Sequence, residues 1–297
     1  MIHIPVLLNE IVENLCIDPD GIYVDATYGA GGHTKEILKK INQGKIISFD
    51  QDNNILNLST IKDKRLKIIN QNFIYLKNNL SVLGLKKVDG IIADLGLSSF
   101  QINSKRGFSY NHDSDFDMRM NPNAKLTASE IVNYYDFEQL KNMFRNLGEI
   151  KNHASLSRAI IAKRENKNIK TVFEFLASIN NCIPSNKKNK YLSKVFQAIR
   201  IEVNSELENL KSFLQQSCEF LKTGSRLLII SYHSLEDRLV KNFIKHGNFS
   251  GIEKKDIYGN NLSALKLIYK KPIVPSLNEL KKNIRSRSAK LRVAVKL

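Results

Sequence analysis

Short apolar stretches rich in β-branched residues recur in the first hundred residues and again near the C-terminus. They predict strands at residues 21–27, 45–52, 66–73, 88–97, 225–233, 264–274 and 291–297. Between several of them, apolar residues recur at helical spacing, as with Leu210, Phe213 and Leu214. Strands that alternate with helices favour parallel β-α units covered on both faces. The pattern therefore predicts an α/β fold with a parallel sheet.

This alternation stops between about residues 105 and 195. The region is polar and helical in pattern, as in "LTASEIVNYYDFEQLKNMFRNLG" and "SLSRAIIAKRENK", and it contains no convincing strand. We therefore predict a sheet domain formed by residues 1–104 and 196–297, with residues 105–195 as a helical insertion domain.

The stretch "YVDATYGAGGHT" (residues 23–34) closes the first predicted strand and opens a helix. It contains Asp25, Gly29, Gly31, Gly32, His33 and Thr34, the last expected to cap the helix. Ligands of open α/β sheets bind at the carboxyl ends of the strands. The spacing is not G-x-G-x-x-G, which argues against a nicotinamide-dependent dehydrogenase. A carboxylate at the strand end repels a pyrophosphate but suits an ammonium group, such as that of S-adenosylmethionine (SAM).

Further acids end the second and fourth predicted strands, at Asp50 and Asp94, and Phe73 ends the third. Asp50 is suited to accept hydrogen bonds from both ribose hydroxyls, and Phe73 could flank an adenine ring. Each residue taken alone also has an ordinary interpretation: a strand-end acid, a loop cap in the case of Asp25, or a core aromatic in the case of Phe73.

The net charge of +17 favours a polyanionic partner such as RNA, DNA or an anionic membrane, although biased codon usage would also enrich Lys and Asn. The three cysteines, Cys16, Cys182 and Cys218, are far apart and form no C-x-x-C pair, which argues for a reducing cytosol and against a metal site. The N-terminus does not resemble a secretory signal, and no apolar run is long enough to span a membrane.

Seven sequence blocks resemble one family closely: "HIPVLLNEIV", "GIYVDATYGAGGHT", "DLGLSSFQINSKRGFSY", "DFDMRMNP", "VFQAIRIEVNSELENL", "ISYHSLEDRLVKNF" and "RSRSAKLRVA". They are similar to the RsmH (MraW) family of bacterial 16S ribosomal RNA cytosine-N4 methyltransferases. The resemblance implies methyl transfer from SAM to the N4 atom of a cytidine in the decoding centre. It implies a SAM-dependent methyltransferase Rossmann-like sheet with an inserted all-helical substrate-recognition domain. The implied partner is 16S rRNA in the small ribosomal subunit or its precursor, in the cytoplasm, with the protein a monomer or a homodimer.

The resemblance assigns cofactor contacts residue by residue. These positions are Gly31, Gly32, His33, Asp50, Phe73, Asp94 and Gln101. One departure lies beside them, because Phe100 stands where the family usually has proline.

The implied chemistry needs an acceptor near N4, which becomes cationic as it attacks the methyl group. No metal is required. Asp94 is the first catalytic candidate, although it is equally suited to bind the SAM amino group. His233 is the second, with the alternative that Ser234 and Asp237 form a capping box and this segment only starts a helix.

The polar stretch "RGFSYNHDSDFDMRM" (residues 106–120) follows the Asp94 segment. Its predicted substrate contacts are Arg106, Phe108, Asp117 and Arg119, with Phe108 or Tyr110 stacked on a flipped base. Alternatively, Met118 and Met120 pack the insertion against the sheet and Arg119 pairs with Asp117. Arg285 and Arg287 suit RNA phosphates.

Two other functions remain open at this level. One is SAM-dependent methylation of DNA or protein. The other is a non-catalytic RNA-binding assembly factor, against which the intact acids Asp25, Asp50 and Asp94 argue.

Overall fold

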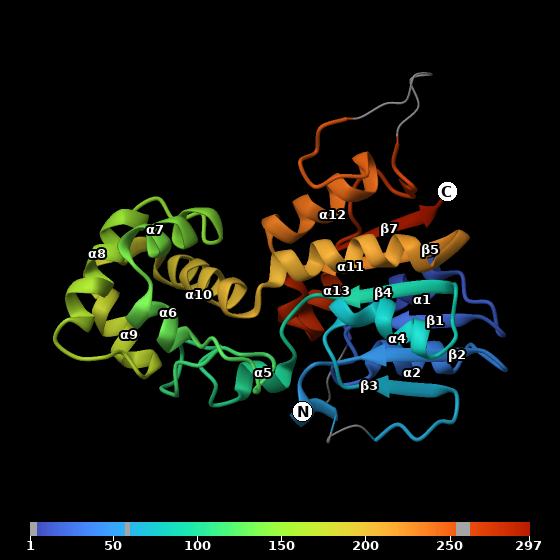
Figure 1. Ribbon diagram of the computed structural model, residues 1–297, viewed down its shortest axis with the longest axis horizontal. Coiled ribbons are helices and arrows are strands. Elements are labelled where there is room, and N and C mark those ends of the chain that lie inside the picture. Colours follow the sequence, from blue (N-terminus) through green and yellow to red (C-terminus); the bar gives the residue numbers. More distant parts are fainter. Residues whose placement is uncertain (1–4, 57–59, 254–261) are drawn as a thin grey trace. The chain divides into compact units, whose positions relative to one another are not determined.

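The computed structural model describes residues 5–56, 60–253 and 262–297 (Figure 1). The chain forms two compact units: a sheet unit of residues 1–96 and 207–297, and a helical unit of residues 97–206. The predicted insertion, residues 105–195, falls inside the helical unit but is too short at both ends. Its C-terminal limit is too early because α10 (Lys188–Asn204) buries residues as late as Val203 in the core of the helical unit.

Among the described residues, seven strands form one sheet in the order β3-β2-β1-β4-β5-β7-β6 (Figure 1). They are β1 (Ile22–Asp25), β2 (Lys45–Phe49), β3 (Leu66–Ile69), β4 (Val88–Asp94), β5 (Leu221–Ser231), β6 (Leu265–Leu267) and β7 (Lys290–Lys296). Each overlaps a predicted strand. The chain moves outward from β1 to β3 and then returns to β4 beside β1, so the strand order reverses between β1 and β4.

The first five strands pair in parallel, as predicted. The prediction was wrong for β7, which pairs antiparallel with both β5 and β6, so that β6 runs in the same direction as the first five strands. A parallel partner needs a crossover that carries the chain back to the same end of the sheet. The segment between β6 and β7 instead reverses the chain, so that β7 lies antiparallel between β5 and β6.

The helices of the sheet unit cover both faces of the sheet. One face packs against α4 (Leu76–Val82), α11 (Glu206–Phe220) and α12 (Ser234–His246), and the other against α1 (Leu8–Leu15) and α2 (Gly32–Leu38). The predicted helical face of Leu210, Phe213 and Leu214 is buried in the first of these cores. The remaining short elements are α3 (Asn53–Leu56), α13 (Leu277–Lys282) and the 3-10 turns η1 (Phe73–Tyr75) and η4 (Ile284–Ser288).

The helical unit contains α5 (Ser99–Asn103), α6 (Ala128–Tyr134), α7 (Phe137–Asn146), α8 (His153–Arg164), α9 (Val172–Ile179), α10 and the turns η2 (Asn180–Cys182) and η3 (Ser185–Lys187). Capping boxes fix the start of four of these helices, at Ser98, Thr127, Asp136 and Thr171. The rings of Phe116 and Phe175 stack in the core with centroids 4.6 Å apart. Residues 97–206 are all described, and their only extended pairing is an isolated bridge. Among the described residues of the whole chain, none of the helices has both the length and the apolar character needed to span a membrane.

Candidate active site

Three carboxylates lie at the carboxyl edge of the parallel strands, where the strand order reverses. Asp25 ends β1, Asp94 ends β4 and Asp50 follows β2. Thr27 links two of them, because its backbone N–H donates to Asp25 Oδ1 at 3.1 Å and its Oγ1 accepts from the Asp94 backbone N–H at 2.6 Å. The Gly29 N–H donates to Asp50 Oδ2 at 2.9 Å. The structure therefore brings the predicted acids to one edge and joins them to the glycine loop.

Asp25 is enclosed, with 1% of its surface exposed. The Thr34 hydroxyl donates to Asp25 Oδ2 at 2.7 Å and also lies 2.9 Å from Ser48 Oγ. Burial raises the pKa of Asp25, and the charge of His33 and the Thr34 hydrogen bond oppose this rise. Asp25 thus shapes the loop through its hydrogen bonds to Thr27 and Thr34, and direct cofactor contact by Asp25 stays a prediction.

The expected helix cap at Thr34 was wrong. Helix α2 begins at Gly32 with Gly31 as its N-cap residue, so Thr34 lies inside the helix. Its hydroxyl is turned to Asp25 instead of to the helix N-terminus, because Asp25 is a buried acceptor that needs partners.

Protein atoms pack closely against two of the loop glycines. A Cβ at Gly31, where φ is +75°, would lie 2.7 Å from Tyr28 Oη, and a Cβ at Gly32 would lie 2.2 Å from Pro5 Cγ. At Gly29, where φ is +53°, a Cβ would meet only the Thr27 carbonyl oxygen at 3.9 Å. Gly31 and Gly32 are therefore required by the fold itself, whereas the backbone at Gly29 is left accessible.

The His33 side chain joins α2 to the N-terminal segment. It is 6% exposed, and its Nε2 lies 2.9 Å from the Val6 carbonyl oxygen. Because a carbonyl oxygen only accepts, this nitrogen carries the proton. The imidazole ring thus has a packing role, and a cofactor contact at His33 stays a prediction.

Asp50 is only partly exposed, and its two oxygens accept backbone N–H groups. Oδ2 accepts from Gly29 and Oδ1 accepts from Asp52, each at 2.9 Å. Burial raises the pKa of Asp50 to about 6, against the lowering effect of these hydrogen bonds. The pKa of Asp50 therefore lies closer to neutral pH than that of an ordinary aspartate.

Phe73 opens η1 after β3, and its half-buried ring packs on Phe213 with the centroids 5.0 Å apart. The ordinary interpretation of Phe73 as a core contact is therefore confirmed. Its partial exposure is compatible with a ligand beside it, and that contact stays a prediction.

His233 caps α12. Its side chain accepts from the Glu236 backbone N–H, while Glu236 accepts from the backbone N–H groups of Tyr232 and His233. The alternative that this segment starts a helix is confirmed, but the predicted Ser234–Asp237 box was wrong. Asp237 instead pairs with the Arg292 guanidinium, with Oδ1 2.6 Å from Nε. The catalytic role of His233 stays a prediction.

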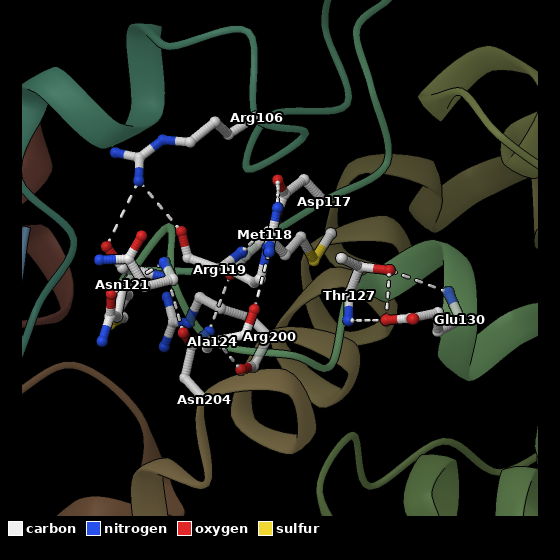
Figure 2. A network of polar contacts seen from close by, with 12 residues as sticks. Arg106, Asp117, Met118, Arg119, Asn121, Ala124, Thr127, Glu130, Arg200 and Asn204 are labelled. Carbon is white, nitrogen blue, oxygen red and sulfur yellow. Dashed lines mark hydrogen bonds and ion pairs between the residues drawn. The ribbon is translucent and has the colours of Figure 1, made fainter.

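In the helical unit, the polar loop of residues 106–120 is held by its own side chains (Figure 2). The Arg119 guanidinium donates to both oxygens of Asp117, at 2.7 and 2.8 Å, and to the Ala124 carbonyl oxygen at 2.7 Å. Arg106 donates to the Arg119 and Met120 carbonyl oxygens at 3.1 and 3.3 Å. The alternative that Arg119 pairs with Asp117 is confirmed, and these charged groups fix the shape of the loop. The substrate contacts of Arg106, Asp117 and Arg119 stay predictions.

Two aromatic candidates of this loop are packed against the helical unit. Phe108 is 8% exposed within its core, beneath the Arg106 guanidinium. The Tyr110 hydroxyl lies 3.1 Å from Ser193 Oγ. A base could stack on Phe108 only after that ring left the core. The alternative that Met118 and Met120 pack the insertion against the sheet was wrong, because Met118 is buried in this unit's own core and Met120 packs against that same core.

Gln101 and the arginines of the C-terminal region differ in exposure. Gln101 is buried in the helical unit, where its side chain accepts from the Ser98 N–H at 3.0 Å as part of a capping box. Arg285 and Arg287 are exposed on η4 of the sheet unit, on either side of buried Ser286. The contacts predicted for Gln101, Arg285 and Arg287 stay predictions.

Sequence reasoning missed several polar residues of this edge. They are Thr27, Ser48 and Tyr232. The signal for Ser48 was a hydroxyl inside the apolar stretch "IISF", and Tyr232 directly precedes His233.

The whole chain, residues 1–297, matches the family described as the MraW methylase family. A protein of Christiangramia forsetii named "Ribosomal RNA small subunit methyltransferase H" is 50% identical over 99% of this chain and 98% of its own length. A protein of Amoebophilus asiaticus with the same name is 50% identical over 98% of this chain and 94% of its own length. A third protein with that name, from Flavobacterium johnsoniae, is 48% identical over 99% of this chain and 98% of its own length. The chain therefore belongs to the MraW methylase family, as its sequence predicted.

Proposed function

We propose that this protein transfers the methyl group of SAM to the exocyclic N4 of one cytidine in the decoding centre of 16S rRNA. The observation that carries the proposal is the full-length identity of about half with proteins named as ribosomal RNA small subunit methyltransferases. The three strand-end carboxylates and the accessible backbone at Gly29 support a cofactor with a ribose and an ammonium group.

Each group at this edge has a proposed task. Asp50 accepts hydrogen bonds from the ribose hydroxyls, and Gly29 lets the cofactor approach the backbone. Asp94, which is partly exposed, lies nearest to the chemistry. It either stabilises the charge that develops on N4 or binds the SAM ammonium.

The reaction requires N4 and the SAM methyl carbon to be held in line at about 3–3.5 Å. The N4 lone pair is delocalised into the pyrimidine ring, so N4 is a weak nucleophile. As the new carbon–nitrogen bond forms, the sulfonium loses its charge and N4 gains it. A carboxylate beside N4 is worth most at that moment, because it stabilises the transition state more than the ground state.

The surface charge supports an RNA substrate. The net charge is +17, and the helical unit exposes Arg145, Lys151, Arg158 and Lys163, while the sheet unit exposes Arg285 and Arg287. Arginines and lysines on such surfaces bind phosphates without reading sequence. The cytoplasm is the proposed location, and the free thiols of all three cysteines agree with it.

The test uses small ribosomal subunits from cells that lack the protein. They are incubated with the protein and SAM carrying a deuterated methyl group, and the 16S rRNA is digested and mapped by mass spectrometry. We expect the label on N4 of a single cytidine in the decoding region. Parallel incubations contain naked DNA or total protein. Label found only in one of these would reject the proposal in favour of another methyl acceptor.

A further inference from the structure

Tyr232 lies next to Asp94 at the carboxyl edge of the sheet, although sequence analysis assigned it no role. Strands β4 and β5 are parallel neighbours in which Asp94 pairs with Ile230. The pairing continues past Asp94, because the Leu95 N–H donates to the Ile230 carbonyl oxygen at 3.0 Å. Tyr232 therefore follows β5 beside the segment that leaves β4.

Gly96, just past the end of the neighbouring strand β4, makes room for the Tyr232 ring. A Cβ at Gly96 would lie 2.6 Å from Tyr232 Cε2 and 3.0 Å from Cδ2 and Cζ. The ring thus packs directly on the Gly96 backbone, and any larger residue at that position would displace it. At the other side, the Tyr232 backbone N–H donates to Glu236 Oε2 at 2.9 Å. Both the backbone and the ring of Tyr232 are therefore held in place.

The fixed ring directs its hydroxyl to Asp94, and the two side chains share a hydrogen bond. Burial raises the pKa of Tyr232, and the negative charge of Asp94 raises it further. Tyr232 is therefore a neutral phenol that donates its proton to the Asp94 carboxylate. The other charged groups that face this pair are Asp25 from β1, Glu236 from α12 and Glu279 from α13. All three are acidic, so the hydroxyl is the group in this set that favours an ionised Asp94.

We propose that Tyr232 is a positioning residue whose hydroxyl holds the Asp94 carboxylate ionised and in one orientation at the site of methyl transfer. This inference rests on the proposed function. The phenol hydrogen-bonds to the Asp94 carboxylate, and because its ring is packed against Gly96 it can hold that carboxylate in one orientation. A hydrogen bond to the charged form of a carboxyl lowers its pKa. Without the hydroxyl, Asp94 would ionise at higher pH and rotate freely.

The test compares Tyr232→Phe with the matched control Tyr23→Phe. Both variants keep the ring and remove a phenol hydroxyl in the sheet unit. Tyr23 lies near the amino end of β1, where its hydroxyl accepts from the Asp18 N–H at 2.6 Å. We expect Tyr232→Phe to lower kcat for rRNA methylation about tenfold, the loss expected for one hydrogen bond to a charged group. The acidic limb of its pH–rate profile should move to higher pH, whereas Tyr23→Phe should keep the wild-type profile.

A second measurement needs no substrate. The carboxyl carbons of the free protein, labelled with ¹³C-aspartate, are titrated by NMR, and the Asp94 signal is identified by its loss in Asp94→Asn. Tyr232→Phe should move the Asp94 titration to higher pH, and Gly96→Ala, which displaces the ring, should do the same. An Asp94 titration unchanged in Tyr232→Phe would overturn the inference. If the wild type failed to methylate rRNA but the titration moved as expected, the proposed function would fail while the contact of Tyr232 with Asp94 stood.

Discussion

Relative to the wild type, the Asp50→Asn variant should become more stable as pH rises in the absence of cofactor. The same variant should bind SAM more weakly than the wild type. The pKa of Asp50 is raised from 3.8 to about 6, with burial as the main cause. The folded protein therefore binds a proton more tightly than the unfolded chain does. Stability from this group is fully present below pH 3.8 and is lost as pH rises through 6. At 1.36 kcal/mol per pKa unit, the loss in the wild type approaches about 3 kcal/mol, as an upper bound for a partly exposed group.

The assay is urea unfolding of both proteins from pH 4 to pH 7. Asparagine does not titrate, so the difference in unfolding free energy should grow in favour of Asp50→Asn by up to about 3 kcal/mol over this range. Asp63→Asn is the control. Asp63 is paired with Arg65, and its pKa is lowered to about 2, mainly by the Arg65 hydrogen bond. The difference in unfolding free energy between Asp63→Asn and the wild type should therefore not change with pH above pH 4.

Cofactor binding should change in the opposite direction. If an ionised Asp50 accepts the ribose hydroxyls, the wild type should bind SAM about tenfold more weakly at pH 5 than at pH 7, since about one molecule in ten is then ionised. Calorimetry should show weaker binding by Asp50→Asn at pH 7 and no comparable pH dependence. The reasoning would be refuted if the two proteins bound SAM with equal affinity at pH 7. It would also be refuted if their unfolding free energies in urea changed in parallel with pH.

Three further substitutions test other parts of the account. Gly32→Ala places a Cβ 2.2 Å from Pro5 Cγ and should destabilise the protein by about 1–3 kcal/mol, which thermal melting would detect; an unchanged melting temperature would contradict this packing. Asp237→Ala leaves the buried Arg292 without its carboxylate and should cost about 3 kcal/mol in urea unfolding, and a loss below about 1 kcal/mol would count against the ion pair. Arg285→Ala should weaken RNA binding without changing SAM affinity, and the slope of log K against log salt concentration should fall by about one. An unchanged slope in filter binding would show that Arg285 is not part of the RNA interface.

Much of the sheet could be predicted because its strands are short apolar stretches, three of which end in an acid or are followed by one. The acids at the ends of β1, β2 and β4 met at one edge because parallel strands share their carboxyl ends. The family, the α/β fold class and SAM as the cofactor class were also predicted, and the family match confirms them.

The errors came from contacts between distant residues. The direction of β7 depends on where the chain turns at the sheet edge, which an apolar pattern does not encode. Thr34 matched a helix cap locally, but buried Asp25 competed for its hydroxyl. Phe108 stands in a polar loop, and its local sequence does not predict burial. Its ring is nevertheless buried, because the core of the helical unit combines apolar residues of this loop with those of the helices.

The most direct test of the central claim is a crystal structure of the protein with SAM. The account predicts the ribose hydroxyls on Asp50, the cofactor against the backbone of Gly29 and the methyl group on the side of Asp94. A cofactor bound away from these strand ends would contradict the account. So would a cofactor whose ribose did not contact Asp50 or whose methyl group did not lie beside Asp94.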